Sequence, residues 1–129
     1  MIEGSAGAKT SGKLRYGMVG GGKGAFIGDV HRRAIALDGL AALVAGSFSQ
    51  SFDNTLETGA GLGLSRDRLY ASYSEMAEKE AARPDGIDFV SIVTPNALHY
   101  SVAKAFLNAG INVVCDKPLT FEEAEAREL

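Results

Sequence analysis

Six glycines lie within the twelve residues from Gly17 to Gly28, between an apolar run and a segment with helical spacing. The apolar run, Leu14–Gly20, predicts a β-strand. The apolar residues between Ile27 and Leu37 recur on one face of a helix, which Gly39 would end in a left-handed cap. Backbone N–H groups and the positive end of the helix dipole can approach an anion closely in such a turn, because no side chain intervenes. The pattern therefore predicts a site for the pyrophosphate of a dinucleotide.

The spacing fits the pattern G-x-G-x-x-G imperfectly. Gly20 and Gly22 take the first two positions, and Ala25, a residue that the pattern allows, takes the third. A register through Gly24 that ends at Gly28 has one residue too many. The alternative is a flexible loop without a ligand, but the strand before the turn and the helix after it favour the dinucleotide site.

Short apolar runs alternate with helical segments along the rest of the chain. Strands are predicted at Leu14–Gly20, Ala41–Phe48, Leu69–Ala71, Phe89–Thr94 and Ile111–Cys115. Ser72 with Glu75 and Thr120 with Glu123 have the spacing of a capping box, which predicts a helix after each pair. Gly110 would close the helix before the last strand.

This alternation implies right-handed βαβ crossovers. The expected fold class is therefore α/β, a doubly wound, mostly parallel sheet of the Rossmann type in three α/β/α layers. We expect this dinucleotide-binding domain over residues 13–129. Residues 1–12 are small and polar without periodicity, which predicts a disordered leader.

Composition excludes several classes of function. The 13 Lys and Arg against 16 Asp and Glu give no basic stripe, which argues against a nucleic-acid partner. The chain has no long apolar run and no secretory leader, so we expect no membrane partner and a cytoplasmic location. One cysteine and two histidines fall short of a closed zinc site, so no metal is expected.

The second predicted strand ends without the acidic residue that usually binds the adenosine ribose of NAD. The stretch Ala45–Ser49 offers two hydroxyls and no charge. Such an end would tolerate a 2′-phosphate, and Lys23 or Arg32 could pair with it, although the commoner outcome is that both side chains face solvent. The cofactor is therefore predicted to be NADP or NAD, with a preference for NADP or none.

Two further loops follow the fourth and fifth predicted strands, at the same edge as the glycine turn. Thr94-Pro95-Asn96 begins a helix, with Thr94 or Asn96 as its cap and His99 in its first turn. Asp116-Lys117-Pro118 ends the last strand abruptly. A capped helix start and a surface turn would also account for these residues.

Together, the glycine turn at 20–28, Thr94-Pro95-Asn96 with His99, and Asp116-Lys117-Pro118 resemble the N-terminal cofactor domain of the Gfo/Idh/MocA oxidoreductases. This is the family of glucose-fructose oxidoreductase and inositol dehydrogenase, and the similarity runs from Leu14 to Leu129. It implies NAD(P)-dependent hydride transfer at a hydroxyl carbon of a sugar, cyclitol or related polyol.

The resemblance also implies roles for individual residues. Lys117 would be the catalytic lysine of the family's Glu-Lys-Pro motif and would orient the substrate hydroxyl, while Asp116 is one methylene shorter than the family's glutamate. The residues implied in cofactor binding are Gly20, Gly22, Gly24, Ala25, Phe26, Ser47, Thr94, Pro95, Asn96, His99, Asp116 and Lys117.

In that family a second domain supplies the substrate pocket and proton-transfer residues. We therefore expect this chain to bind cofactor without turnover. The alternative is a non-catalytic nucleotide sensor or partner-docking module, and self-association is left open. For His31 we expect a packing or capping role rather than that of a base, and for Cys115 an inert thiol in a strand.

Overall fold

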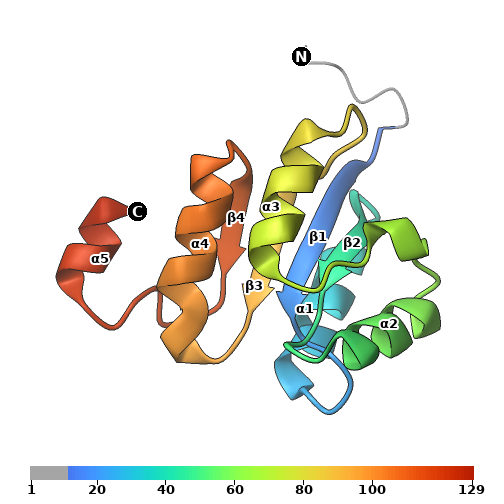
Figure 1. Cartoon of the computed structure of the whole chain (residues 1–129), viewed down its shortest axis with the longest axis horizontal. Helices are drawn as coiled ribbons and strands as arrows, with labels where there is room; N and C mark the ends of the chain where they lie inside the picture. Colours follow the sequence, from blue (N-terminus) through green and yellow to red (C-terminus); the bar gives the residue numbers. More distant parts are fainter. Residues whose placement is uncertain (1–11) are drawn as a thin grey trace.

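Residues 12–129 are described by a computed structural model, so the predicted leader, apart from Gly12, lies outside the described residues. The centre is a parallel sheet of four strands in the order β2-β1-β3-β4. The strands are β1 (Leu14–Gly20), β2 (Ala41–Ser47), β3 (Phe89–Val93) and β4 (Asn112–Cys115). All pairs are parallel, so the carboxyl ends of the strands share one edge of the sheet (Figure 1).

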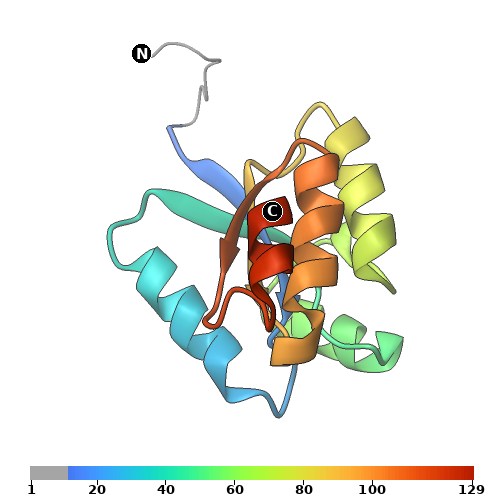
Figure 2. The same ribbon diagram turned by 90° about the vertical axis from the view of Figure 1, so that its left-hand side faces the viewer.

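Helices cover both faces of this sheet. Helix α1 lies on one face, and α3 and α4 lie side by side on the other (Figure 2). The helices are α1 (Phe26–Ala36), α2 (Phe52–Gly61), α3 (Tyr73–Ala82), α4 (His99–Asn108) and α5 (Glu123–Glu128), with short 3-10 turns η2 (Arg66–Arg68) and η3 (Asn96–Leu98). The predicted fold class, a doubly wound α/β domain in three layers, is confirmed.

The side chains of β3 show why the sheet is covered twice. Val90 and Ile92 belong to the core under α3 and α4, whereas Phe89 and Val93 belong to the core under α1. Successive side chains of a strand point to opposite faces, so an almost continuous apolar run is buried on both. The ring of Phe89 also stacks on that of Tyr16 in β1, with centroids 5.3 Å apart.

The third predicted strand, Leu69–Ala71, is wrong. Leu69 makes only an isolated bridge to Gly46, and the residues before it form η2. The prediction for β2 was one residue too long, because Phe48 turns back and its buried ring lies over Gly46, where a Cβ atom would collide with it. The sheet therefore has four strands rather than five.

Helix ends were predicted with mixed success. The Ser72 hydroxyl accepts a hydrogen bond from the Glu75 amide at 3.2 Å, which confirms this cap. Gly39 and Gly110 have the expected positive φ, +70° and +83°. The cap at Thr120 is wrong, because its hydroxyl donates to the Glu122 carbonyl instead. Within residues 12–129, no helix has the length and apolar character needed to cross a membrane.

Candidate functional site

A cleft of about 580 Å³ opens at the carboxyl ends of β1, β2 and β3. We call it the strand-end cleft. Five of the predicted site residues line it: Gly20, Ala25, Ser47, Thr94 and Pro95. Gly22 and Gly24 line a shallower hollow beside it, between the glycine turn and α2. Three loops that are far apart in the sequence therefore meet where the fold class places a ligand.

Close backbone packing explains the glycines of the turn. A Cβ atom on Gly20 would lie 2.8 Å from the Thr94 nitrogen, and one on Gly28 would lie 2.5 Å from the Cα atom of Gly21. Gly28 therefore brings α1 against the strand end, which is the role of the third glycine in the fingerprint. Ala25, the residue that the sequence pattern placed third, is the N-cap residue of α1. Gly21 and Gly28 were not among the predicted site residues.

The beginning of the turn is anchored by the protein itself. The Gly22 amide donates to the Phe48 carbonyl at 3.0 Å. The Lys23 amide donates to Asn54 Oδ1 at 3.1 Å and to Thr58 Oγ1 at 3.0 Å. These two amides are therefore already used to hold the turn against α2 and the loop after β2.

The N-terminus of α1 is the part of the turn best suited to an anion. Ala25 is the N-cap residue of this eleven-residue helix, and no side chain caps it. Since Ala25 also lines the strand-end cleft, the positive end of the helix dipole lies beside that cleft. Phe26 follows as the first residue of the helix, with 81% of its surface exposed.

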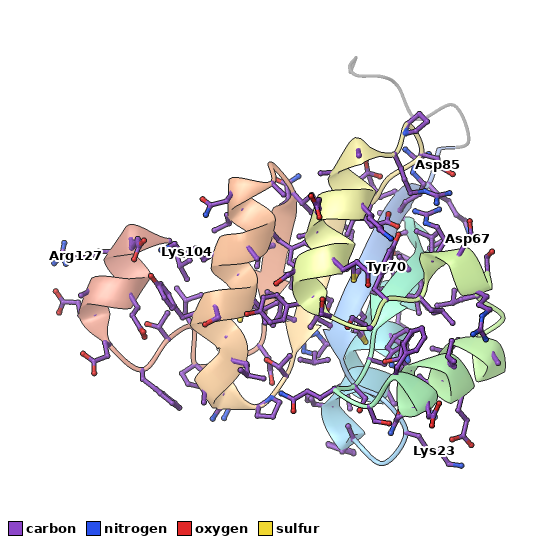
Figure 3. All side chains as sticks on the ribbon, viewed as in Figure 1. Lys23, Asp67, Tyr70, Asp85, Lys104 and Arg127 are labelled. Atoms are coloured by element: carbon purple, nitrogen blue, oxygen red, sulfur yellow. The ribbon has the colours of Figure 1, made fainter. Side chains whose placement is uncertain are left out.

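Both predicted cations have other partners. Lys23 Nζ lies 2.7 Å from Glu57 Oε2, and this hydrogen bond raises the pKa of the exposed Lys23 ammonium (Figure 3). Arg32 Nη1 donates to the Gly21 carbonyl at 3.1 Å. Arg32 therefore stabilises the glycine turn. The sequence had suggested either a bond to the 2′-phosphate or a side chain that faces solvent.

The wall formed by the loop after β2 carries hydroxyls but no acid. Ser47 is buried, and Ser49 and Gln50, which the sequence reasoning left out of the site, also line the cleft. The Ser49 amide donates to Thr55 Oγ1 at 3.1 Å, and that hydroxyl donates back to the Ser49 carbonyl at 3.2 Å. This reciprocal pair holds the loop in place.

Neither Thr94 nor Asn96 caps the following helix. The Thr94 hydroxyl donates to the Pro95 carbonyl at 3.2 Å, and η3 begins after Pro95 without a side-chain cap. The prediction of a cap here is wrong, because a 3-10 turn precedes α4 and displaces its start to His99. Asn96, the first residue of η3, is exposed and does not line the strand-end cleft.

His99 is fully buried. Its Nδ1 lies 2.6 Å from the Pro118 carbonyl oxygen, and its Nε2 lies 3.1 Å from the Thr94 carbonyl oxygen. The imidazole therefore joins the loop after β3 to the turn after β4.

The turn after β4 begins with Asp116, whose amide donates to the Ile92 carbonyl at 3.0 Å. Its Oδ1 lies 3.5 Å from Nε2 of His31, and His31 Nδ1 lies 3.0 Å from Ser91 Oγ. His31 thus packs against the sheet, as expected, and also contacts an acidic side chain. Within the described residues, no carboxylate pairs with the exposed Lys117.

Cys115 lies at the end of β4. Burial, and then the charge of Asp116, raise the pKa of its thiol, which agrees with the expected inert role. Among residues 12–129, no group of three or more His, Cys, Asp or Glu side chains could hold a metal ion.

Comparisons with known proteins agree with this geometry. Residues 14–129 match the model of the oxidoreductase family with an NAD-binding Rossmann fold. An uncharacterized oxidoreductase of Bacillus subtilis is 44% identical over 117 residues, which cover 90% of this chain and 30% of that protein.

Solved structures give the same result. An inositol dehydrogenase homologue from Azotobacter vinelandii, complexed with NADH and myo-inositol, has 45% identity and a TM-score of 0.87, over 90% of this chain and 31% of that one. An oxidoreductase from Pseudomonas syringae has 46% identity and a TM-score of 0.87, over 90% and 32%. The chain spans about a third of the length of these relatives. It belongs to the Gfo/Idh/MocA oxidoreductase family and carries that family's NAD-binding Rossmann fold.

Proposed function

We propose that the chain binds NAD or NADP in the strand-end cleft as the cofactor domain of an oxidoreductase. The enzyme would transfer hydride between the nicotinamide and a hydroxyl carbon of a sugar, cyclitol or related polyol. The observation that carries the proposal is the packing of Gly28 on Gly21, which sets the uncapped start of α1 beside the cleft. The complex of the Azotobacter homologue with NADH and myo-inositol supports the choice of ligands.

Each loop would have a separate part in binding. The amides at the start of α1 would hold the pyrophosphate, and Ser47 and Ser49 would hydrogen-bond the adenosine ribose. Thr94 and Pro95 would line the path toward the nicotinamide, where the cofactor supplies the hydride chemistry. The ammonium of Lys117 would donate a hydrogen bond to the substrate oxygen and so orient the reacting carbon.

The test is calorimetry of the chain with each nicotinamide dinucleotide, and a pair of substitutions at Ala25 sharpens it. Ala25→Asp and Ala25→Asn both supply a cap for α1, so both should keep or raise stability. Only the aspartate adds a negative charge where the pyrophosphate would bind. We expect Ala25→Asp to weaken binding at least about tenfold more than Ala25→Asn does. No binding heat from the folded, unsubstituted chain at millimolar dinucleotide would overturn the proposal.

The preference between the two cofactors is tested in the same way. The loop between β2 and α2, residues 48–51, carries no acidic side chain to repel a 2′-phosphate, so we expect NADP to bind as tightly as NAD or more tightly. Lys23 would have to exchange Glu57 for that phosphate. Titrations at one salt concentration that show NAD at least about tenfold tighter would contradict this expectation.

A docking module is the second candidate, and an exposed apolar group favours it. Leu119 and Phe121, just after Lys117, are 47% and 67% exposed. In a docking module they would form part of the contact with another domain or chain. A fusion of the chain to the second domain of a family relative distinguishes the two candidate functions. Only the oxidoreductase function predicts that this fusion forms NADH from NAD when polyol is added.

A further inference from the structure

Two histidines contact the residues on either side of Lys117. His31 comes from α1 and His99 from α4, and these helices lie on opposite faces of the sheet (Figure 2). The contact of His31 is with Asp116, and that of His99 is with Pro118. The turn that presents Lys117 is therefore held from both faces.

The contact on the α1 face runs through three side chains. The carboxylate of Asp116 only accepts hydrogen bonds, and His31 Nε2 lies 3.5 Å from its Oδ1, so the favourable arrangement places a ring hydrogen on Nε2. In the neutral ring, Nδ1 then accepts from the hydroxyl of Ser91, 3.0 Å away and fully buried in β3. This chain fixes the orientation of the His31 ring against the sheet.

The contact on the α4 face is a direct hydrogen bond to the backbone. A carbonyl oxygen only accepts, so His99 must donate to Pro118, and the short 2.6 Å distance assigns a hydrogen to Nδ1. The neutral ring donates from one nitrogen, and the imidazolium would donate to the Thr94 carbonyl as well. His99 is fully buried, so water does not compete for either contact.

We infer that His31 and His99 are positioning residues that hold the Asp116-Lys117-Pro118 turn between the two faces of the sheet. The consequence of this arrangement for catalysis rests on the proposed function. In that function α1 begins at the pyrophosphate site and α4 follows the Thr94 loop, so the two histidines link both of these cofactor-binding loops to Lys117. Each histidine contacts the turn through a different ring nitrogen, Nε2 in His31 and Nδ1 in His99.

That difference gives a specific test. The amide nitrogen of glutamine reaches about as far along the side chain as Nε2 of histidine, whereas that of asparagine reaches about as far as Nδ1. Glutamine should therefore replace His31 toward Asp116, and asparagine should replace His99 toward Pro118. If the histidines acted only by packing, the better substitute would not be glutamine at position 31 and asparagine at position 99.

For His31 the readout is hydrogen exchange at the Asp116 amide, measured by NMR on the 129-residue chain. We expect His31→Asn to accelerate this exchange about tenfold and His31→Gln less than about threefold, with β1 amides unchanged. Arg33→Gln, an exposed substitution on the same helix, is the matched control and should change nothing. Equal effects of the two His31 variants, or equal acceleration throughout β1, would overturn the inference.

For His99 the readout is the carbonyl carbon shift of Pro118. We expect the Pro118 carbonyl carbon to keep the chemical shift of a hydrogen-bonded carbonyl in His99→Asn and to lose it in His99→Gln. The opposite order would overturn the inference. Since either change in a buried residue could unfold the chain, the unsubstituted chain supplies a second measurement. A scalar coupling between His99 Nδ1 and the Pro118 carbonyl carbon is expected, and its absence would overturn the inference.

These measurements need no cofactor, so they stay separate from the proposed function. Failure to bind dinucleotide would overturn that function and leave the exchange pattern intact. In the His31 variants, we expect the NADH dissociation constant to change less than about twofold, because this imidazole does not line the strand-end cleft. A large loss of NADH affinity in His31→Asn would mean that the residue supports the cofactor site instead of the lysine.

Discussion

Lys117 is the residue on which the proposed reaction depends most directly. Its side chain is exposed in the turn after β4, and no carboxylate within the described residues neutralises it. An ammonium group in this state can donate to a substrate oxygen without first breaking an ion pair.

We therefore expect Lys117→Ala to lower kcat about 100-fold or more in a complete enzyme that contains this domain. Cofactor affinity should change less than about twofold, because Lys117 does not line the strand-end cleft. Steady-state kinetics and a cofactor titration check both numbers. Lys104→Ala, which removes a surface pair with Glu128 and a contact with Tyr100, is the control. Parallel losses of turnover and cofactor affinity would contradict the assigned role.

Gly28 tests the packing that forms the glycine turn. A Cβ atom there would meet the backbone of Gly21, which cannot move aside as a flexible side chain could. We expect Gly28→Ala to lower the free energy of unfolding by about 1–3 kcal/mol and to weaken dinucleotide binding. Urea unfolding and calorimetry measure the two effects.

Gly61→Ala is the control, since Gly61 is also a helical glycine but has no neighbouring atom within 4 Å of the added Cβ. This variant should gain about 0.4–1 kcal/mol through the unfolded chain. Similar losses in both variants would show that glycine is needed for backbone flexibility rather than for close packing.

At the scale of elements, one buried carboxylate joins η2 to α3. Glu80 of α3 accepts from Arg68 Nε at 2.8 Å and from Arg68 Nη2 at 2.7 Å. The Tyr70 hydroxyl donates to it at 2.5 Å and the Ile87 amide at 3.2 Å (Figure 3). All these donors converge on one side chain that is 1% exposed. The segment after η2 also forms one wall of the strand-end cleft through Tyr73.

We expect Glu80→Ala to destabilise the domain by about 3 kcal/mol, because it leaves the Arg68 guanidinium buried with only its contacts to Asp85. Urea unfolding followed by circular dichroism measures the change. The matched control on α3 is Lys79→Gln, which removes an exposed pair with Glu75 and should cost less than about 0.5 kcal/mol. A loss below about 1 kcal/mol for Glu80→Ala would show that the network adds little to stability.

The elements show how far sequence patterns reach. Apolar runs predicted β1 and β3, because strands buried on both faces must be apolar almost throughout. An apolar run also predicted β4, although this edge strand is only half-buried or exposed. The run at Leu69–Ala71 was too short to form a strand. The side chains of Arg68 and Tyr70 instead bond to Glu80, eleven positions after Leu69, and no local sequence pattern connects these residues. Ser72 was recognisable as a cap, whereas Thr120 has the same spacing and bonds elsewhere.

The candidate site was predicted in outline for a similar reason. Loops at the carboxyl ends of parallel strands must share an edge, so the glycine turn at 20–28 and the loops at 94–96 and 115–118 were expected to meet at one crevice. Residues of the first two line the strand-end cleft, whereas none of residues 115–118 does. Side-chain partners depend on distances between elements, which the sequence does not contain. The partners of Arg32, His31 and His99 therefore became known only from the structure.

At the scale of the whole molecule, the Glu80 network links stability to alkaline pH. Burial, and then the hydrogen bond to Glu80 and its charge, raise the pKa of Tyr70. The unfolded chain releases this proton near pH 10, the ordinary value for tyrosine, while the folded chain still holds it. The contribution of Tyr70 is thus fully present below about pH 10 and is lost as the pH rises toward the higher folded value.

We expect the free energy of unfolding to fall above about pH 10, with Tyr70 contributing at most about 1.4 kcal/mol per pH unit. Tyr70→Phe removes this titrating group but also a donor to Glu80, so it should be less stable at pH 8 and lose less between pH 10 and pH 11. Urea unfolding of both proteins across this range gives the two slopes. Because other groups that titrate in this range remain in the variant, the difference between the slopes isolates Tyr70. Identical slopes would show that the hydroxyl ionises equally readily in the folded and unfolded chains, and the network would then hold Tyr70 by packing alone.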